Sequence, residues 1–230
     1  MSSDKVFYAV VGFFTVLLFA GIVFFATKNN PSTPSTSEPI TYDAKELIGE
    51  NPHVYGDLAT APVVLVEFSD FQCPACKNFA TTFISRVKEL YPNDVAIVYR
   101  NLPLTTIHKY SFNAAVAAEA AAKQDKFWEY HDALFENQGT NDDQLKEEDF
   151  VKIAGDLGLD TEKFKSDYNS SNVESLARDD LNYALSLNLN STPTIFINGV
   201  KIDLQHTDPF TYIEKIVSSS TPKTPKAKTE

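Results

Sequence analysis

The residues of this chain that could do chemistry are two cysteines separated by two positions. Cys73-Pro74-Ala75-Cys76 follows the apolar run 63–68 and opens the helix-compatible stretch 77–90. A helix start has unpaired backbone N–H groups and a partial positive charge, so a sulfur held there is favoured as the thiolate. Pro74 fits the first helical turn, where its missing N–H is not needed. The order of strand, CxxC and helix therefore indicates thiol-disulfide chemistry.

The same cysteine spacing also occurs in half of a zinc site and in pairs of inert buried thiols. The chain has only these two cysteines, and its histidines are far apart in sequence, at His53, His108, His131 and His206. None of them has the close spacing of zinc modules. We therefore expect a redox pair that needs neither a metal nor an organic cofactor.

Composition limits the class of protein. The 230 residues include 31 acidic and 20 basic side chains, which gives a net charge of -11. No basic cluster lies in the part expected to fold, which argues against nucleic acid as the main partner. The hydrophobic content of 43% is enough for one good-sized core. We expect a single elaborated domain that is a monomer.

The N-terminus predicts a membrane anchor. Residues 6–26 form an uncharged stretch of 21 residues, long enough at about 1.5 Å per residue to cross a bilayer. The alternative is a cleaved signal peptide, but the apolar part of such peptides is about 7 to 15 residues long. Phe24-Phe25-Ala26 also lacks the small-x-small cleavage pattern. We expect an uncleaved single-pass anchor over residues 1–27, whose orientation the flanking charges do not set.

The remaining chain divides into a linker, a folded region and a tail. Residues 28–41 are rich in Pro, Ser and Thr and predict an extended, disordered linker. Residues 218–230 repeat Thr-Pro-Lys and predict a disordered tail. Between them, residues 42–217 predict strands at 63–68, 95–99, 194–197 and 200–202, and helices at 77–90, 110–123, 127–136, 150–157, 160–168, 173–187 and 208–217.

Two motifs together resemble the DsbA-like branch of the thioredoxin superfamily. They are Glu67 to Cys76 (EFSDFQCPAC) and Ser191 to Gly199 (STPTIFING), with helices between them. The resemblance covers most of the folded region. It implies an α/β thioredoxin fold with an inserted helical domain at about residues 105–190, here preceded by the single N-terminal transmembrane helix.

The resemblance also assigns roles at the site. It implies that Cys73 is the exposed nucleophile, that Cys76 is the resolving thiol, and that Thr192-Pro193 faces the sulfurs with a cis peptide bond. Glu67 lies six residues before Cys73, like the acidic residue beneath the active site in this family, and could shuttle the proton of Cys76. The residues alone leave open that Glu67 is an exposed carboxylate on the other face of its strand.

Two histidines and one alanine limit what can be inferred about catalysis and redox potential. We expect His108 and His131 to be structural, because nothing in the sequence places either near sulfur. Ala75 stands where enterobacterial members of the family have a histidine. The missing histidine argues against a very strongly oxidising potential.

The predicted anchor and the resemblance together imply a membrane-tethered thiol-disulfide oxidoreductase that introduces disulfides into extracytoplasmic proteins through a mixed disulfide at Cys73. Its partners would be reduced or unfolded substrate proteins and a membrane thiol reoxidase of the DsbB or vitamin K epoxide reductase type. The catalytic domain would lie outside the cytoplasm, at the cell membrane. Two alternatives stay open: a reductase or isomerase that uses the same site, and a tethered chaperone that binds unfolded segments.

Overall fold

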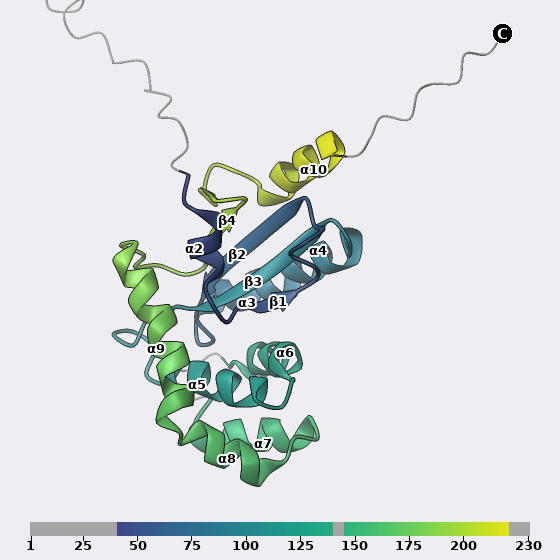
Figure 1. Cartoon of the computed structure of the whole chain (residues 1–230). Coiled ribbons are helices and arrows are strands. Elements are labelled where there is room, and N and C mark those ends of the chain that lie inside the picture. The colour runs from purple at the N-terminus through teal and green to yellow at the C-terminus, as the bar shows by residue number, and fades with distance from the viewer. Residues whose placement is uncertain (1–40, 140–144, 221–230) are drawn as a thin grey trace, which may run out of the picture. The chain divides into compact units, whose positions relative to one another are not determined.

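The computed structural model describes residues 41–139 and 145–220, which build a five-stranded sheet and the helices that pack on it. The strand order is β1-β3-β2-β4-β5 (Figure 1). The strands are β1 His53–Tyr55, β2 Val63–Ser69, β3 Val95–Asn101, β4 Thr194–Ile197 and β5 Val200–Lys201. β2 is parallel to β3 and antiparallel to β4, so it is a central strand, and the cysteines follow directly after its end.

Helices cover both faces of this sheet. They are α2 Ala44–Ile48, α3 Pro74–Asn78, η1 Phe79–Ile84, α4 Ser85–Leu90, α5 Ser111–Ala122, α6 Phe127–Asn137, α7 Glu147–Asp156, α8 Thr161–Tyr168, α9 Ser171–Ser186 and α10 Pro209–Ser220. Val63 and Leu65 of β2 pack with η1, α4 and α10, whereas Val66 and Phe68 pack with α2 and the end of α9. Side chains alternate along a strand, so Glu67 shares the face of Leu65 and lies in an apolar layer.

The helix that follows the cysteines contains a π-helical segment, η1, between α3 and α4. Thr81 Oγ1 donates to the Lys77 carbonyl at 2.8 Å, and Ser85 Oγ donates to the Ala80 carbonyl at 3.0 Å. Such hydroxyls compete with the backbone N–H groups for the carbonyls of the preceding turn. The sequence predicts one continuous helix over 77–90, and the π segment is the difference. Such segments are frequent at functional sites.

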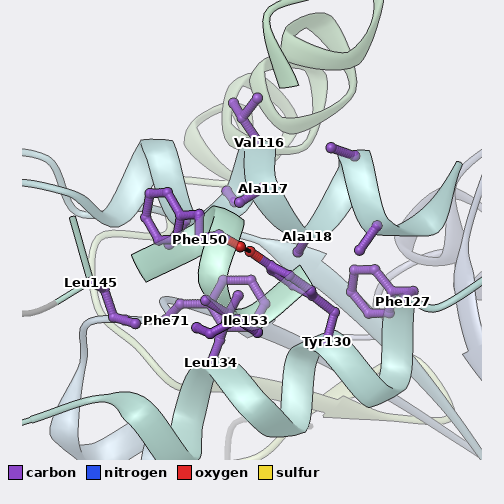
Figure 2. Close-up of a cluster of buried hydrophobic side chains, with 14 of the residues drawn as sticks. Phe71, Val116, Ala117, Ala118, Phe127, Tyr130, Leu134, Leu145, Phe150 and Ile153 are labelled. Carbon is purple, nitrogen blue, oxygen red and sulfur yellow. Dashed lines mark hydrogen bonds between the residues drawn. The ribbon is translucent and has the colours of Figure 1, made fainter. Parts of the chain in front are cut away.

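Among the residues that the structure describes between β3 and β4, there are five helices, α5 to α9. The alanines of α5 let neighbouring helices approach closely, so that α5 is buried along most of its length. Figure 2 shows Val116, Ala117 and Ala118 of α5 among the aromatic side chains of the surrounding elements. Tyr130 of α6 donates from its hydroxyl to the Phe150 carbonyl of α7 at 2.9 Å, which satisfies a buried polar group inside this core.

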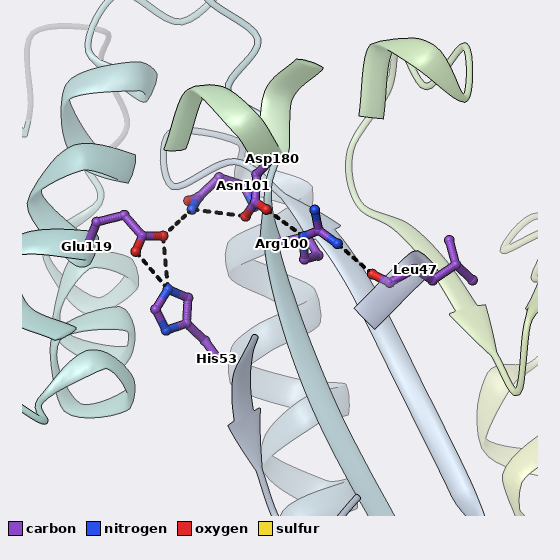
Figure 3. A network of polar contacts seen from close by, with 6 residues as sticks. All are labelled: Leu47, His53, Arg100, Asn101, Glu119 and Asp180. Atoms are coloured by element: carbon purple, nitrogen blue, oxygen red, sulfur yellow. Dashed lines mark hydrogen bonds and ion pairs between the residues drawn. The ribbon is translucent and has the colours of Figure 1, made fainter. Parts of the chain in front are cut away.

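A buried polar network joins these helices to the sheet. Figure 3 shows its six residues: Leu47, His53, Arg100, Asn101, Glu119 and Asp180. Arg100 Nε donates to Asp180 Oδ1 at 2.5 Å, and Arg100 Nη1 donates to the Leu47 carbonyl at 2.7 Å. Asn101 donates from its backbone N–H to Asp180 at 2.8 Å and from its side chain to Glu119 at 2.8 Å. The network therefore connects α5 and α9 to β3 and α2.

Every helix and strand predicted from the sequence is present, with ends that differ by a few residues. The structure adds α2 and β1, which have five and three residues and are too short to give a recognisable hydrophobic period. Asn198 and Gly199 have φ angles of 48° and 82°, as the predicted type I′ turn requires. The closing helix α10 runs to Ser220 rather than Val217, so the first residues of the predicted tail are helical.

The predicted anchor lies outside the described residues, as do residues 28–40 of the linker and 221–230 of the tail. Residue 41 is described, and Thr41 forms an isolated antiparallel bridge with Val200 of β5. Over residues 41–139 and 145–220, no helix combines the length and apolar character needed to cross a bilayer.

Candidate active site

Cys73 is the N-cap residue of α3, with extended backbone angles φ -79° and ψ 120°, and Pro74 occupies the first turn. The backbone N–H of Cys73 donates to the Asp70 carbonyl at 3.0 Å, which closes the loop between β2 and α3. Cys73 and Cys76 are free thiols, so this is the geometry of the reduced form. The sequence prediction that the first cysteine begins a helix after a buried strand is confirmed.

Cys73 is less exposed than the resemblance implied. Its accessible fraction is 7%, because its sulfur lies 3.5 Å from the Thr192 carbonyl oxygen and because it packs in the same apolar cluster as Phe71. Cys76 is completely buried, with an accessible fraction of 0%. Cys73 is therefore still the more accessible of the two cysteines, but the expectation of an exposed nucleophile was wrong in degree.

The surroundings of Cys73 favour its thiolate. A hydrogen bond from the Cys76 thiol is the largest influence and lowers the pKa of Cys73 to about 5, although burial opposes the shift. The Thr192 hydroxyl and the backbone N–H groups of Cys76 and Ala75 lower this pKa further. The donors at the start of α3 thus act as the sequence predicts. At neutral pH the Cys73 sulfur is an anion that can attack or leave.

The pKa of Cys76 shifts in the direction opposite to that of Cys73. Burial raises the pKa of its thiol well above the ordinary value, and the neighbouring Cys73 and Glu67 raise it further. Cys76 therefore keeps its proton at neutral pH. Any step in which the Cys76 sulfur attacks or departs needs a group that takes or supplies that proton.

Glu67 lies close enough to Cys76 to raise the pKa of its thiol. Its side chain is buried, with 1% exposed, so the alternative of an exposed carboxylate is wrong. Burial raises the pKa of Glu67 to about 7, and Lys88 and Ser69 partly offset this effect. A carboxyl group that titrates near neutral pH can both accept and return a proton under physiological conditions.

Ser69 is a site residue that the sequence reasoning missed. Its hydroxyl lies close enough to lower the pKa of Glu67, Cys76 and Tyr99. Tyr99 is opposite Glu67 in the parallel register of β2 and β3. Among the described residues, no hydrogen-bond partner of standard geometry is present for Glu67 Oε1, Ser69 Oγ or the Tyr99 hydroxyl. The signal that could have identified Ser69 is its position two residues after Glu67, on the same face of β2.

The loop of Thr192 and Pro193 faces the redox pair, as the resemblance implied. The Thr192-Pro193 peptide bond is cis, and this expectation is confirmed. The carbonyl of Thr192 points at the Cys73 sulfur at 3.5 Å, so the structure brings together Cys73, Cys76, Thr192, Pro193 and the underlying Glu67.

The two histidines near the site have structural surroundings. His108 Nδ1 lies 2.9 Å from Asp70 Oδ2, and the same Asp70 oxygen accepts from the backbone N–H of Leu104 at 2.7 Å. His131 is buried among aromatic rings, and burial lowers its pKa. Within the described part of the chain, no group of three or more His, Cys, Asp or Glu side chains is arranged to hold a metal ion.

Comparison with known proteins identifies the family. Residues 49–214 match the family model described as Thioredoxin. The Probable disulfide bond formation protein D of Bacillus cereus is 30% identical over 207 residues, which cover 86% of this chain and 91% of that protein. The crystal structure of oxidised BdbD from Bacillus subtilis superposes with a TM-score of 0.67 at 25% identity, covering 79% of this chain and 100% of that one.

Another group of relatives is much longer than this chain. The Na(+)/H(+) antiporter NhaA 1 of Mycolicibacterium vanbaalenii is 42% identical over 143 residues, which are 61% of this chain but 22% of the antiporter. The chain thus spans about a fifth of the length of such curated relatives. The matched family model, the relative of similar length and the cysteine pair beside a cis-proline lead to one conclusion: the chain belongs to the DsbA-like branch of the thioredoxin superfamily.

Proposed function

We propose that the chain introduces disulfides into extracytoplasmic proteins. A substrate thiolate attacks Cys73, the Cys73–Cys76 bond breaks, and the released Cys76 sulfur takes a proton from Glu67. A second substrate thiolate then attacks the substrate sulfur of the mixed disulfide, and Cys73 leaves as a thiolate. The substrate loses two electrons, and the enzyme is left as the dithiol.

The low pKa of Cys73 carries this proposal. Whatever stabilises the Cys73 thiolate lowers the energy of the reduced enzyme, and so makes the disulfide a better oxidant. The Cys73 pKa of about 5 supports net oxidation. The Bacillus cereus relative is named a probable disulfide bond formation protein, which agrees with this direction.

A pocket next to the cis-proline offers a place for the substrate chain. It has a volume of about 440 Å³ and is bordered by Pro193, Thr194, Ile202 and Leu204. The apolar side chains of Pro193 and Leu204, the latter 38% exposed, suit an extended, unfolded segment, which could add main-chain hydrogen bonds as a strand does. We propose that this pocket receives the residues that flank the substrate cysteine.

We expect a reduction potential between those of thioredoxin, at about -270 mV, and DsbA, at about -120 mV. The Cys73 pKa of about 5 lies between the nucleophile pKa values of those two proteins, about 7 and about 3.5. Equilibration with glutathione, followed by quantification of both thiol states, measures the potential. A value at or below that of thioredoxin would favour the reductase alternative.

We further propose that the domain is held outside the cytoplasm by the predicted anchor and is reoxidised by a membrane thiol oxidase of the DsbB or vitamin K epoxide reductase type. The support for the anchor is the uncharged sequence of residues 6–26. Protease added to intact cells or spheroplasts should therefore digest residues 42–217. A domain that stays protected until the membrane is permeabilised would contradict this placement.

A further inference from the structure

Gln138 makes an unusual set of contacts at the end of α6. It is the C-cap residue of this helix, and only 6% of it is exposed. Its side-chain Nε2 donates to the Phe71 carbonyl at 2.7 Å and to the Cys73 carbonyl at 3.1 Å. One amide group from the inserted helices thus binds two carbonyls of the loop that presents the nucleophile.

A side chain of α3 also donates hydrogen bonds to the end of α6. Lys77, one residue after the resolving cysteine, donates from Nζ to the main-chain carbonyl of Gln138 at 2.7 Å. It also lies 3.5 Å from the Glu136 carbonyl, another of the free carbonyls at the end of α6. A cation is favoured at this end of a helix, because the last carbonyls are unpaired and carry a partial negative charge. The end of α6 is therefore bonded to the redox loop through the Gln138 side chain, and to Lys77 of α3 through the Gln138 main-chain carbonyl.

We propose that Gln138 is a positioning residue for the redox pair: it fixes the loop from Phe71 to Cys73 so that the Cys73 sulfur faces the N–H groups at the start of α3. The proposal rests on the thiol chemistry of Cys73 but not on the direction of electron flow. It would survive if the enzyme proved to be a reductase.

The physical reason is the geometry of the N-cap. The Cys73 sulfur reaches the backbone N–H groups of Ala75 and Cys76 only while Cys73 keeps its extended backbone angles. Within this loop, the Cys73 N–H is tied to the Asp70 carbonyl, and Gln138 holds the carbonyls of Phe71 and Cys73. Without the amide, the Phe71 carbonyl loses its buried donor and the Cys73 carbonyl keeps the Lys77 N–H of α3, so the loop is held less firmly against the helix start.

Gln138→Met tests the proposal, because methionine keeps the length and volume of glutamine but has no donor. The matched control is Gln124→Met. Gln124 also makes two side-chain hydrogen bonds within the inserted helices, donating to the Asp160 carbonyl at 3.1 Å and accepting from the Asp160 N–H at 3.0 Å. The control removes the same chemical group, at a place that has no contact with the redox loop.

Two readouts separate positioning from simple stabilisation. In Gln138→Met, the midpoint of Cys73 alkylation against pH should rise by about one unit from its wild-type value near 5. The equilibrium constant for oxidising glutathione should fall by about tenfold, which is about 30 mV for a two-electron couple. Gln124→Met should leave both readouts at wild-type values.

An unchanged midpoint and potential in folded Gln138→Met would overturn the proposal, even if the melting temperature falls, because a purely structural residue destabilises both redox forms equally. Equal shifts in the Gln124→Met control would also overturn it. If Gln138→Met does not fold, Gln138→Asn carries the test. Asparagine keeps the amide but is one methylene shorter and cannot reach both carbonyls. It should shift both readouts in the same direction by a smaller amount, and unchanged values would again overturn the proposal.

Discussion

Cys73→Ser should abolish thiol-disulfide exchange, reducing the oxidation of a dithiol peptide to the uncatalysed rate. Serine cannot form the disulfide that the substrate thiolate attacks, and its hydroxyl is not an anion at neutral pH. Cys76→Ser should behave differently, because it retains the accessible Cys73 thiolate and lacks the resolving thiol. We expect it to accumulate mixed disulfides with substrate proteins, visible as adducts on non-reducing gels and removed by reductant.

This pair of variants also tests the class of the protein. The chaperone alternative treats the cysteines as incidental, so it predicts full activity in cells for Cys73→Ser. That result would reject the enzyme mechanism. Adducts that form through Cys76 in the Cys73→Ser variant, but not through Cys73 in Cys76→Ser, would reverse the assignment of nucleophile and resolving thiol.

Glu67→Gln should remove a contribution that lowers the stability of the reduced protein as the pH rises from about 4.5 to 7, so the variant should gain stability relative to the wild type over this range. The pKa of Glu67 is about 7 in the folded protein and has a reference value of 4.5, so the folded state binds more protons in this window. The stabilisation from Glu67 is complete below the unfolded pKa and is lost as the pH rises through the folded one. The shift corresponds to about 3 kcal/mol.

Urea unfolding of the reduced wild type and Glu67→Gln at pH 4.5 and pH 8 measures this difference. The low pKa of Cys73 acts in the opposite direction, adding stability as the pH rises, but Cys73 is present in both proteins, so its contribution largely cancels and leaves only its electrostatic coupling to Glu67. Glu89→Gln, which removes an exposed carboxyl from α4, is the control for a change of one charge. Parallel pH profiles for the wild type and Glu67→Gln would show that Glu67 is not the titrating group.

The sequence predicted the parts of the site that local chemistry determines. The CxxC pair requires a helix start, and the apolar run before it requires a buried strand, so the position of Cys73 followed from about fifteen consecutive residues. The cis bond at Pro193 did not follow in this way and came from the family resemblance, because most X-Pro bonds are trans. The burial of Glu67 depends on which face of β2 is covered, and only the assembled layers show it.

Contacts between segments that are distant in the chain could not be predicted from the sequence. Gln138 is 65 positions from Cys73 and follows a helix whose end is set by packing, and nothing in the local pattern marks it as a partner of the redox loop. Glu119 is a single carboxylate in an alanine-rich helix, and the sequence alone suggests a solvent-exposed position. In the structure, His53 Nε2 of β1 lies 2.9 Å from Glu119 Oε1. β1 itself is only three residues long, so the partner and the contact were missed together.

The last helix of the insertion, α9, has a consequence for how the protein unfolds. Val173 and Ala177 at one end belong to the core of the inserted helices, whereas Ala184 near the other end belongs to the core on the sheet. Between them, Asp180 holds the buried Arg100 side chain of β3. If the inserted helices unfolded alone, the buried Arg100 guanidinium would lose the Asp180 carboxylate. Leaving it unpaired would cost about 3 to 5 kcal/mol. We therefore expect the inserted helices and the sheet to unfold as one cooperative unit, so that hydrogen exchange in α9 and β3 should report the same global opening.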